Sequence, residues 1–258
     1  IVTGQSSSIH NLLKCVENCN VEVDGLVLDP IAAGAAVLTD NEREMGVVLA
    51  DIGGGTTDIA IFIEGSVWHT TVLSVGGYHI TNDVAVGLRV PAEAAEQLKI
   101  EHGHARHEMI DPTEVVQVKA FGDGGLTRVQ RRDLAEIIEA RAEEIYQLIL
   151  QEIKRSGYDG LLPAGVVITG GTAEMRGMRE LGRNTLGMPV RVGQPQNLSG
   201  LIDTINSPAY ATSVGLLLWG RDQRDHSPLL YRRSDEGGPD LGGRLSGFLK
   251  KLLPDRNQ

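Results

Sequence analysis

Two spacings of apolar residues recur along this chain, and together they predict a mixed α/β fold. Short uninterrupted apolar runs at residues 47–50, 59–63 and 166–168 have the length of buried strands. Residues 8–16 and 132–155 carry apolar side chains at helical spacing, which predicts amphipathic helices. Shorter patterns predict further strands at 21–28, 67–75, 114–121, 126–130 and 190–192, further helices at 31–38, 80–88, 91–100, 178–185 and 210–219, a polar turn at 40–44 and a solvated loop at 102–111.

A glycine-rich hairpin separates the strands predicted at 47–50 and 59–63. Its sequence is Asp51-Ile52-Gly53-Gly54-Gly55-Thr56-Thr57-Asp58. Glycines let backbone N–H groups approach phosphate oxygens closely, and the hydroxyls of Thr56 and Thr57 add donors. Asp51 ends its strand at the same place, where its carboxylate can hold the water shell of Mg²⁺. The alternative, a simple turn, leaves these aspartates and threonines unexplained, so the hairpin predicts a phosphate site.

The hairpin is not a P-loop, because no Gly-Lys-Ser/Thr sequence follows it and a strand stands where the helix should be. A second glycine element, Thr169-Gly170-Gly171-Thr172, ends the strand predicted at 166–168. Both strand ends can present backbone N–H groups to one ligand. We therefore expect a cleft of the kind found in α/β nucleotide-binding folds.

Composition and charge limit the kinds of molecule that this protein can have as its main binding partner. The length of 258 residues suits one large domain or two small ones, and an apolar share of 41% is enough for a core. The net charge is −10 and the pI is about 5.2. Nucleic acid is excluded as the main partner, because a phosphate backbone requires a basic surface.

The cysteines and clustered histidines do not predict a metal site. Cys15 and Cys19 are about one helical turn apart, but a zinc site needs about four ligands and no second pair is present. We expect two buried thiols in a reducing cytoplasm. His102, His104 and His107 lie in a polar stretch without other ligands at suitable spacing, which indicates a solvated loop.

The C-terminal residues have the pattern of a basic amphipathic helix behind a linker. Residues 221–240 are charged, contain Gly, Pro and Ser, and lack periodicity, as is typical of a flexible linker. The apolar positions that follow are Leu241, Leu245, Phe248, Leu249, Leu252 and Leu253, and the basic ones are Arg244, Lys250, Lys251 and Arg256. Such a helix lies in the lipid interface and binds reversibly. The alternative is a helix that docks on the protein's own surface, for which so long a linker is unnecessary.

The glycine hairpin is one of four segments whose sequences together carry a resemblance to a known superfamily. The others are residues 28–34, 166–172 and 207–215. Together they resemble the connecting segments, phosphate loop and adenosine loop of the ATPase superfamily of actin, Hsp70 and the sugar kinases. Within it, the chain is most similar to the FtsA family of bacterial cell-division proteins, and the stretches that carry this similarity are 74–91, 94–99, 139–145 and the tail.

This resemblance implies an actin-like, ribonuclease H-like ATPase fold in which the second domain predominates and a C-terminal amphipathic helix follows. The implied boundaries are the end of the first domain at 1–46, the second domain at 47–204 with an inserted subdomain at about 78–159, a return helix at 205–220, the linker at 221–240 and the membrane-targeting tail at 241–258. Most of the first domain is then missing. Because the chain begins at Ile1, we expect it to be a fragment holding half of a nucleotide clamp.

The resemblance also implies ATP and Mg²⁺ as ligands. Asp51 would lie near the Mg²⁺ water shell. The residues expected at the β- and γ-phosphates are Gly53, Gly54, Gly55, Thr56 and Thr57, those at the adenosine and α-phosphate are Gly170 and Gly171, and those at the adenine and ribose are Arg141, Glu143 and Glu144. The alternative for the last three is ordinary helix-surface charge. Asp29 stands where many relatives carry the longer Glu, so weak or absent hydrolysis is expected.

The implied function is that of a scaffold rather than an enzyme. The family polymerises like actin, holds the tubulin-like FtsZ ring through the FtsZ C-terminal peptide, and attaches it to the cytoplasmic face of the cell membrane at the division septum. The residues expected to contact lipid are Leu245, Phe248, Leu249, Lys250, Lys251, Leu252 and Leu253. The alternatives are a pilus-assembly or plasmid-segregating relative and a chaperone or sugar-kinase type of enzyme, and the tail argues against each of them.

Overall fold

The computed structural model describes residues 4–119, 121, 125–196, 198 and 205–226. It divides into two units, Ile1–Trp219 and Gly220–Gln258. The tail predicted at 241–258 lies outside the described residues, as does the predicted linker from residue 227 onward. The linker prediction is wrong for residues 221–226, because helix α9 (Ala211–His226) continues through them.

A five-stranded sheet forms the centre of the first unit. Its strand order is β3-β2-β1-β6-β7, and the bounds are β1 Val47–Ile52, β2 Thr57–Ile63, β3 Ser66–Leu73, β6 Val166–Thr169 and β7 Val190–Val192. β1, β2 and β3 pair antiparallel, whereas β1, β6 and β7 pair parallel. The register sets Asp51 opposite both Asp58 and Thr169. Both predicted glycine elements therefore begin side by side, at the carboxyl ends of the neighbouring strands β1 and β6.

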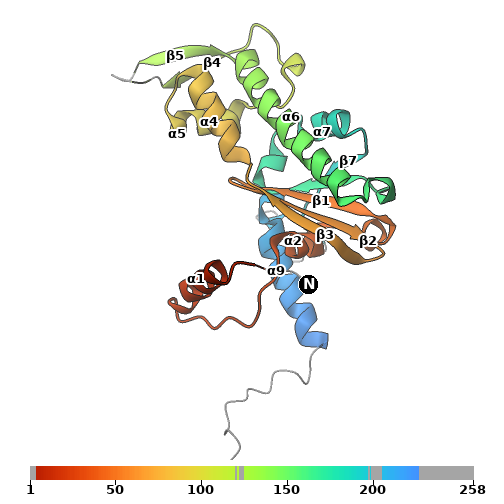
Figure 1. Cartoon of the computed structure of the whole chain (residues 1–258). Helices are drawn as coiled ribbons and strands as arrows, with labels where there is room; N and C mark the ends of the chain where they lie inside the picture. Colours follow the sequence, from red (N-terminus) through yellow and green to blue (C-terminus); the bar gives the residue numbers. More distant parts are fainter. Residues whose placement is uncertain (1–3, 120, 122–124, 197, 199–204, 227–258) are drawn as a thin grey trace, which may run out of the picture. The chain divides into compact units, whose positions relative to one another are not determined.

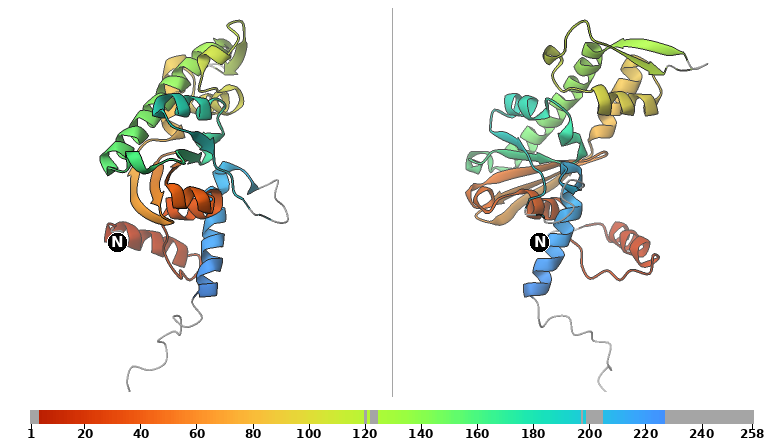
Figure 2. Two further views of the ribbon diagram at one scale, coloured as in Figure 1. Left: turned by 90° about the vertical axis from the view of Figure 1, so that its right-hand side faces the viewer. Right: turned by 180° about the vertical axis from the view of Figure 1, so that it is seen from behind.

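Helices cover both faces of this sheet. Val48 and Ala50 of β1 belong to the core beneath α6 (Arg131–Ser156) and α7 (Met178–Leu186), whereas Val47 and Leu49 face α2 (Asp29–Val37) and the first turns of α9. This alternation follows from the two-residue period of a strand, and burial on both faces explains the uninterrupted apolar runs. Figures 1 and 2 show α6 crossing one face and α2 lying on the other.

The segment between β3 and β6 forms a helical layer beyond the sheet. Its elements are α4 Gly77–Leu88, α5 Ala92–His102, the 3₁₀ turn η1 His107–Met109, a two-stranded sheet of β4 Val115–Lys119 and β5 Leu126–Gln130, α6 and the 3₁₀ turn η2 Asp159–Leu161. α4 packs against both α5 and α6 (Figure 1). Among the described residues, no helix is both long enough and apolar enough to span a membrane.

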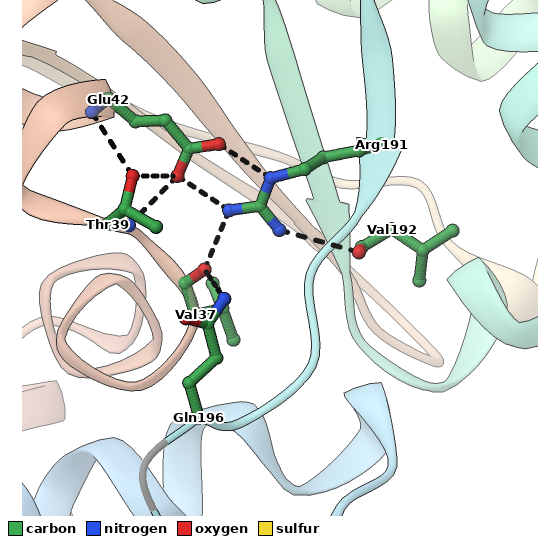
Figure 3. Close-up of polar contacts among 6 residues, drawn as sticks. All are labelled: Val37, Thr39, Glu42, Arg191, Val192 and Gln196. Carbon is green, nitrogen blue, oxygen red and sulfur yellow. Dashed lines mark hydrogen bonds and ion pairs between the residues drawn. The ribbon is translucent and has the colours of Figure 1, made fainter.

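Residues 40–44 are helical, so the predicted polar turn is wrong. Thr39 caps α3 (Asp40–Met45): its hydroxyl accepts from the Glu42 N–H at 3.3 Å, and the Glu42 carboxylate accepts from the Thr39 N–H at 2.8 Å. The Thr-x-x-Glu spacing of such a capping box is present in the sequence and is the signal that predicts this helix. Arg191 of β7 donates to both Glu42 oxygens at 2.6 Å and to the Val37 carbonyl at 2.8 Å (Figure 3).

The structure contradicts two predictions near the N-terminus. Residues 21–28 form no strand, because a strand needs a hydrogen-bonded neighbour and no described strand pairs with them. Cys15 and Cys19 are exposed rather than buried. The predicted apolar pattern does form the helix α1 (Ser6–Glu17), but none of its residues, Cys15 included, is buried, and Cys19 lies just beyond its end.

Candidate functional site

The carbonyl groups of the glycine hairpin accept hydrogen bonds from neighbouring elements of the fold. The Gly53 carbonyl accepts from the Gly77 N–H at 2.9 Å and from the Thr172 hydroxyl at 3.0 Å, and the Gly54 carbonyl accepts from the Tyr78 N–H at 2.7 Å. The first turn of α4 and the second glycine element thus bind the same loop. A side chain at Gly77 would meet the Thr172 hydroxyl at 2.5 Å, so this approach requires glycine.

The opposite side of the hairpin is open. A Cβ added to Gly54 or Gly55 would meet no atom within 4 Å, and both residues are exposed. In the described part of the chain, neither of their N–H groups donates to a protein acceptor. The hairpin therefore presents free backbone donors on a surface that a phosphate can reach.

The two threonines of the hairpin have different surroundings. The Thr56 hydroxyl donates to the Asp58 carboxylate at 3.0 Å on the exposed side. The Thr57 hydroxyl is fully buried and donates to the Val75 carbonyl at 2.8 Å. The expectation that the Thr57 hydroxyl serves a ligand is therefore wrong, because strand alternation turns this side chain into the core.

The second glycine element fits closely against the first. Gly170 has φ 85° and ψ 165°, a region that is essentially restricted to glycine. A Cβ there would lie 2.4 Å from Asp51 Oδ1 and 2.6 Å from the Ile52 carbonyl. Gly171 begins the 3₁₀ turn η3 (Gly171–Glu174), which carries Thr172. The structure thus brings together the two elements that the sequence predicts to share a ligand.

Asp51 carries a buried carboxylate at the centre of this arrangement. Burial raises its pKa, the hydrogen bond from the Thr212 hydroxyl (2.8 Å) lowers it in part, and the nearby charges of Asp58 and Asp29 raise it further. Burial also raises the pKa of Asp58. A hard oxygen donor among neighbouring negative charges suits a hydrated Mg²⁺ ion, which would relieve the repulsion. The charge of Asp29 contributes to both of these pKa shifts, so Asp29 belongs to the same neighbourhood.

A cavity of about 890 Å³ opens beside the hairpin, within the size range of small-molecule sites. It extends from the glycine elements to α5. Its lining residues are Gly54, Gly77, Tyr78, Thr81, Ala92, Glu93, Glu96, Lys99, Ile100, Glu101, Gly103, Gly171, Thr172, Glu174, Met175 and Arg176. The phosphate-type loop and the cavity therefore form one continuous site.

A polar network that the sequence analysis missed lies in this cavity. Lys99 Nζ donates to the Thr81 hydroxyl at 2.8 Å and to the Gly77 carbonyl at 3.2 Å, and lies 2.7 Å from Glu96 Oε2. Burial by itself would raise the pKa of Glu96, but the bonds from Lys99 and Thr81 lower it below its ordinary value. Glu96 and Lys99 are three residues apart on the helix predicted at 91–100, so their shared face was the available signal.

Arg141, Glu143 and Glu144 are not among the residues that line the cavity. Arg141 pairs with Asp83 of α4 and with Glu144, and Glu143 accepts from Gln147 on the same helix. These contacts join α6 to α4 or follow the helix surface. These contacts are those of helix-surface charge, and the adenine–ribose position of the three residues stays a prediction that this cavity does not support.

The histidine segment is partly buried rather than a solvated loop. The His107 N–H donates to Glu139 of α6 at 2.6 Å, and His107 Nδ1 contacts the same oxygen. Burial lowers the pKa of His104, and the charges of Arg131 and Arg176 lower it further. Within the described residues, no group of three or more His, Cys, Asp or Glu side chains is suited to hold a metal ion.

Comparison with known proteins identifies the family. The model of the family described as cell division protein FtsA matches residues 48–215. This chain belongs to the FtsA family. The FtsA protein of Pseudomonas aeruginosa is 44% identical over 220 residues, which are 85% of this chain and 53% of that protein. The FtsA protein of Neisseria meningitidis is 39% identical over 256 residues, with coverage of 97% and 61%. The chain thus spans between half and two thirds of the length of these FtsA relatives.

Solved structures show the fold more widely. MreB5 of Spiroplasma citri bound to ADP superposes with a TM-score of 0.70 at 15% identity, covering 86% of this chain and 68% of that one. The PilM–PilN type IV pilus biogenesis complex gives a TM-score of 0.65 at 17% identity, with coverage of 84% and 59%. The MamK double helical filament gives 0.59 at 17% identity, with coverage of 83% and 65%. These similarities confirm an actin-like α/β fold in this FtsA family member.

Proposed function

We propose that this chain supplies one wall of an ATP site in a cell-division scaffold of the FtsA family. The observation that carries the proposal is the glycine hairpin: the carbonyl groups of Gly53 and Gly54 accept hydrogen bonds from neighbouring elements, whereas the N–H groups of the exposed Gly54 and Gly55 donate to no acceptor in the described part of the chain, and Gly54 lines a cavity. Backbone donors arranged in this way bind phosphate oxygens. The ADP-bound MreB5 structure, which shares the fold, supports a nucleotide as the ligand.

The residues of the site then have distinct roles in binding. Gly54 and Gly55 would bind the β- and γ-phosphates, and Gly170 and Gly171 would lie against the α-phosphate and adenosine. Asp51 would orient the water shell of Mg²⁺, which supplies positive charge to the phosphates when bound. The cavity side chains on α5 extend the site toward the sugar and base.

Glu96 and Lys99 are the side chains of α5 best placed to contact the sugar. Each already has polar partners in the cavity, so both are held in position before a ligand arrives. A carboxylate beside an ammonium group can bind a ribose hydroxyl as both acceptor and donor. Arg141, Glu143 and Glu144 are not part of this proposal.

Binding rather than turnover is proposed as the role of ATP. The charge of Asp29 helps to raise the pKa of Asp51 and of Asp58, and its side chain is one methylene shorter than the Glu that the family resemblance implies for this position. A shorter side chain reaches an attacking water less well. At most weak ATPase activity is expected, and ATP would control assembly.

The proposed partners follow from the family and the C-terminal sequence. The protein would polymerise through its actin-like domains, bind the FtsZ C-terminal peptide through the helical layer between β3 and β6, and attach to membrane lipids through residues 241–258. Its place would be the cytoplasmic face of the cell membrane at the division septum. The filament formed by MamK, which has the same fold, is consistent with self-association.

A pilus-assembly protein of the PilM type is the nearest alternative, because the PilM–PilN structure shares the fold. The sequence relationships favour the division role. The FtsA relatives are 44% and 39% identical, whereas the PilM–PilN structure is 17% identical. A chaperone or sugar kinase of this fold would not need the amphipathic tail.

The experiment that tests the site is Gly54→Val in the full-length protein. The added side chain enters open space, so the fold should not change, but it blocks the approach of a phosphate. We expect the affinity for a fluorescent ATP analogue to fall roughly tenfold or more, about 1.4 kcal/mol. Gly160→Val is the matched control, because Gly160 is also exposed with open space around it and lies outside the site. Equal affinities for the two variants would contradict the phosphate assignment.

A further inference from the structure

We propose that Thr212 is a positioning residue that fixes the Asp51 carboxylate toward a hydrated Mg²⁺ ion. The inference rests on the proposed ATP site and adds a residue that no motif of the hairpin contains. The Thr212 hydroxyl donates to Asp51 Oδ2 at 2.8 Å. The two residues are 161 positions apart in the sequence, so the fold alone brings them together.

The position of Thr212 is set by backbone contact between two helices. Gly215 follows one turn later on the same face of α9, and a Cβ at Gly215 would lie 1.7 Å from the Ala32 carbonyl of α2. The absence of a side chain therefore lets α9 touch the α2 backbone. Ala211 and Val214 are buried in the core between α2 and the sheet. The first turn of α9 is thus anchored on both sides of Thr212.

Asp51 is confined from the other side. Gly170 leaves room for Oδ1, where any Cβ would lie 2.4 Å away, while Oδ2 accepts from Thr212. A carboxylate held by one hydroxyl keeps lone pairs on both oxygens for metal-bound waters. Groups that orient a metal-binding side chain commonly contribute ten- to a hundredfold to metal affinity. Thr212 therefore acts on Mg²⁺ through Asp51, without contacting the nucleotide.

The test compares Thr212→Val with Thr212→Ser in the full-length protein. Val keeps the shape of Thr but removes the hydroxyl, and Ser restores it. Binding of a fluorescent ATP analogue is titrated with Mg²⁺ and measured separately in EDTA. For Thr212→Val we expect the Mg²⁺ concentration at half-maximal binding to rise about tenfold with unchanged affinity in EDTA. Thr212→Ser should behave like the wild type.

A double variant separates positioning from packing. In an Asp51→Asn background, Thr212→Val should cause no additional shift in Mg²⁺ dependence, because the carboxylate through which it acts is already gone. Ser213→Ala, an exposed neighbour on the same helix, is the matched control and should leave binding unchanged. The same comparison remains valid if Thr212→Val lowers stability, since packing loss persists in the Asn background.

Two results would overturn the inference. Equal loss of nucleotide affinity with Mg²⁺ and in EDTA would make Thr212 a packing residue, and an unchanged Mg²⁺ dependence would leave it without a role. Both results presuppose a wild-type protein that binds ATP in a Mg²⁺-dependent way. A wild-type protein without such binding would overturn the proposed function itself, together with this inference.

Discussion

Gly170 shows how one residue connects backbone conformation to the site. Its positive φ and extended ψ are essentially closed to other residues, and its α-carbon lies against both Asp51 and the end of β1. No side chain can occupy this point without moving the carboxylate or the strand. The glycine therefore serves the fold and the site at once.

We predict that Gly170→Ala destabilises the protein by about 2 kcal/mol or more, because backbone strain and a steric clash add together. The midpoint of urea denaturation measures the effect. Gly160→Ala is the matched control, since its Cβ would enter open space and its φ is not positive. A denaturation midpoint for Gly170→Ala within error of that control would show that the loop relaxes freely.

The roles of several other residues of the site could not be predicted from the sequence. The hairpin motif named Thr56 and Thr57 together, but strand alternation buries the Thr57 hydroxyl against the Val75 carbonyl. Lys99 and Thr212 belong to helices whose periodicity was visible, yet nothing local in the chain states which loop each helix faces. Such roles depend on contacts between residues that lie far apart in the sequence.

At the scale of the element, α3 illustrates how a short helix depends on its ends. Six residues are too few for an independent helix, so the capping box of Thr39 and Glu42 and the contact with Arg191 stabilise it. Burial alone would raise the pKa of Glu42, but hydrogen bonds from Arg191 and Thr39 and the Arg191 charge lower it below its ordinary value.

This lowered pKa predicts a pH dependence. A carboxyl group with a lower pKa in the folded state stabilises the fold above its unfolded pKa, and this stabilisation is lost as the pH falls through the folded pKa. We expect Glu42→Gln to cost roughly 1–2 kcal/mol at neutral pH, because a charge-assisted bond becomes neutral. The difference from the wild type should shrink as the pH falls below the ordinary value of 4.5.

Chemical denaturation of both proteins at neutral and acidic pH measures this difference. Glu44→Gln is the control on the same helix, because Glu44 is exposed. A Glu42→Gln difference that stays constant across this range would show that the contact with Arg191 does not depend on charge.

Periodicity predicted most elements because the core is layered. Strands buried on both faces appear as apolar runs, and α6 carries its buried residues at helical spacing. The strand prediction for residues 21–28 is wrong because periodicity alone does not make a strand. Their alternating pattern is compatible with a strand, but pairing requires a neighbour, which the described chain does not provide.

At the scale of the whole molecule, the proposed scaffold joins an ATP site to a membrane contact through one chain. Deleting Leu241–Gln258 should abolish co-sedimentation with anionic liposomes, because the apolar and basic side chains of the amphipathic pattern are removed together. Binding of the FtsZ C-terminal peptide should persist, since the helical layer between β3 and β6 is intact. Fluorescence anisotropy with a labelled peptide measures this second property.

A single substitution sharpens the liposome experiment. Phe248→Glu places a charge on the predicted apolar face and should weaken pelleting strongly, whereas Asn257→Glu adds the same charge outside that face and should have little effect. Undiminished pelleting of the deletion variant would contradict the membrane role. Loss of peptide binding in that variant would instead place the FtsZ contact in the tail.

By itself, the sequence determined most of the element types, the two glycine loops and the family resemblance, because periodicity and glycine spacing are local properties. Only the tertiary structure decided which side of the hairpin is open, that Glu96 and Lys99 rather than Arg141 face the cavity, and that Thr212 holds Asp51. The physical reason is that a helix or strand pattern specifies which face is buried, whereas packing of distant elements specifies what that face meets.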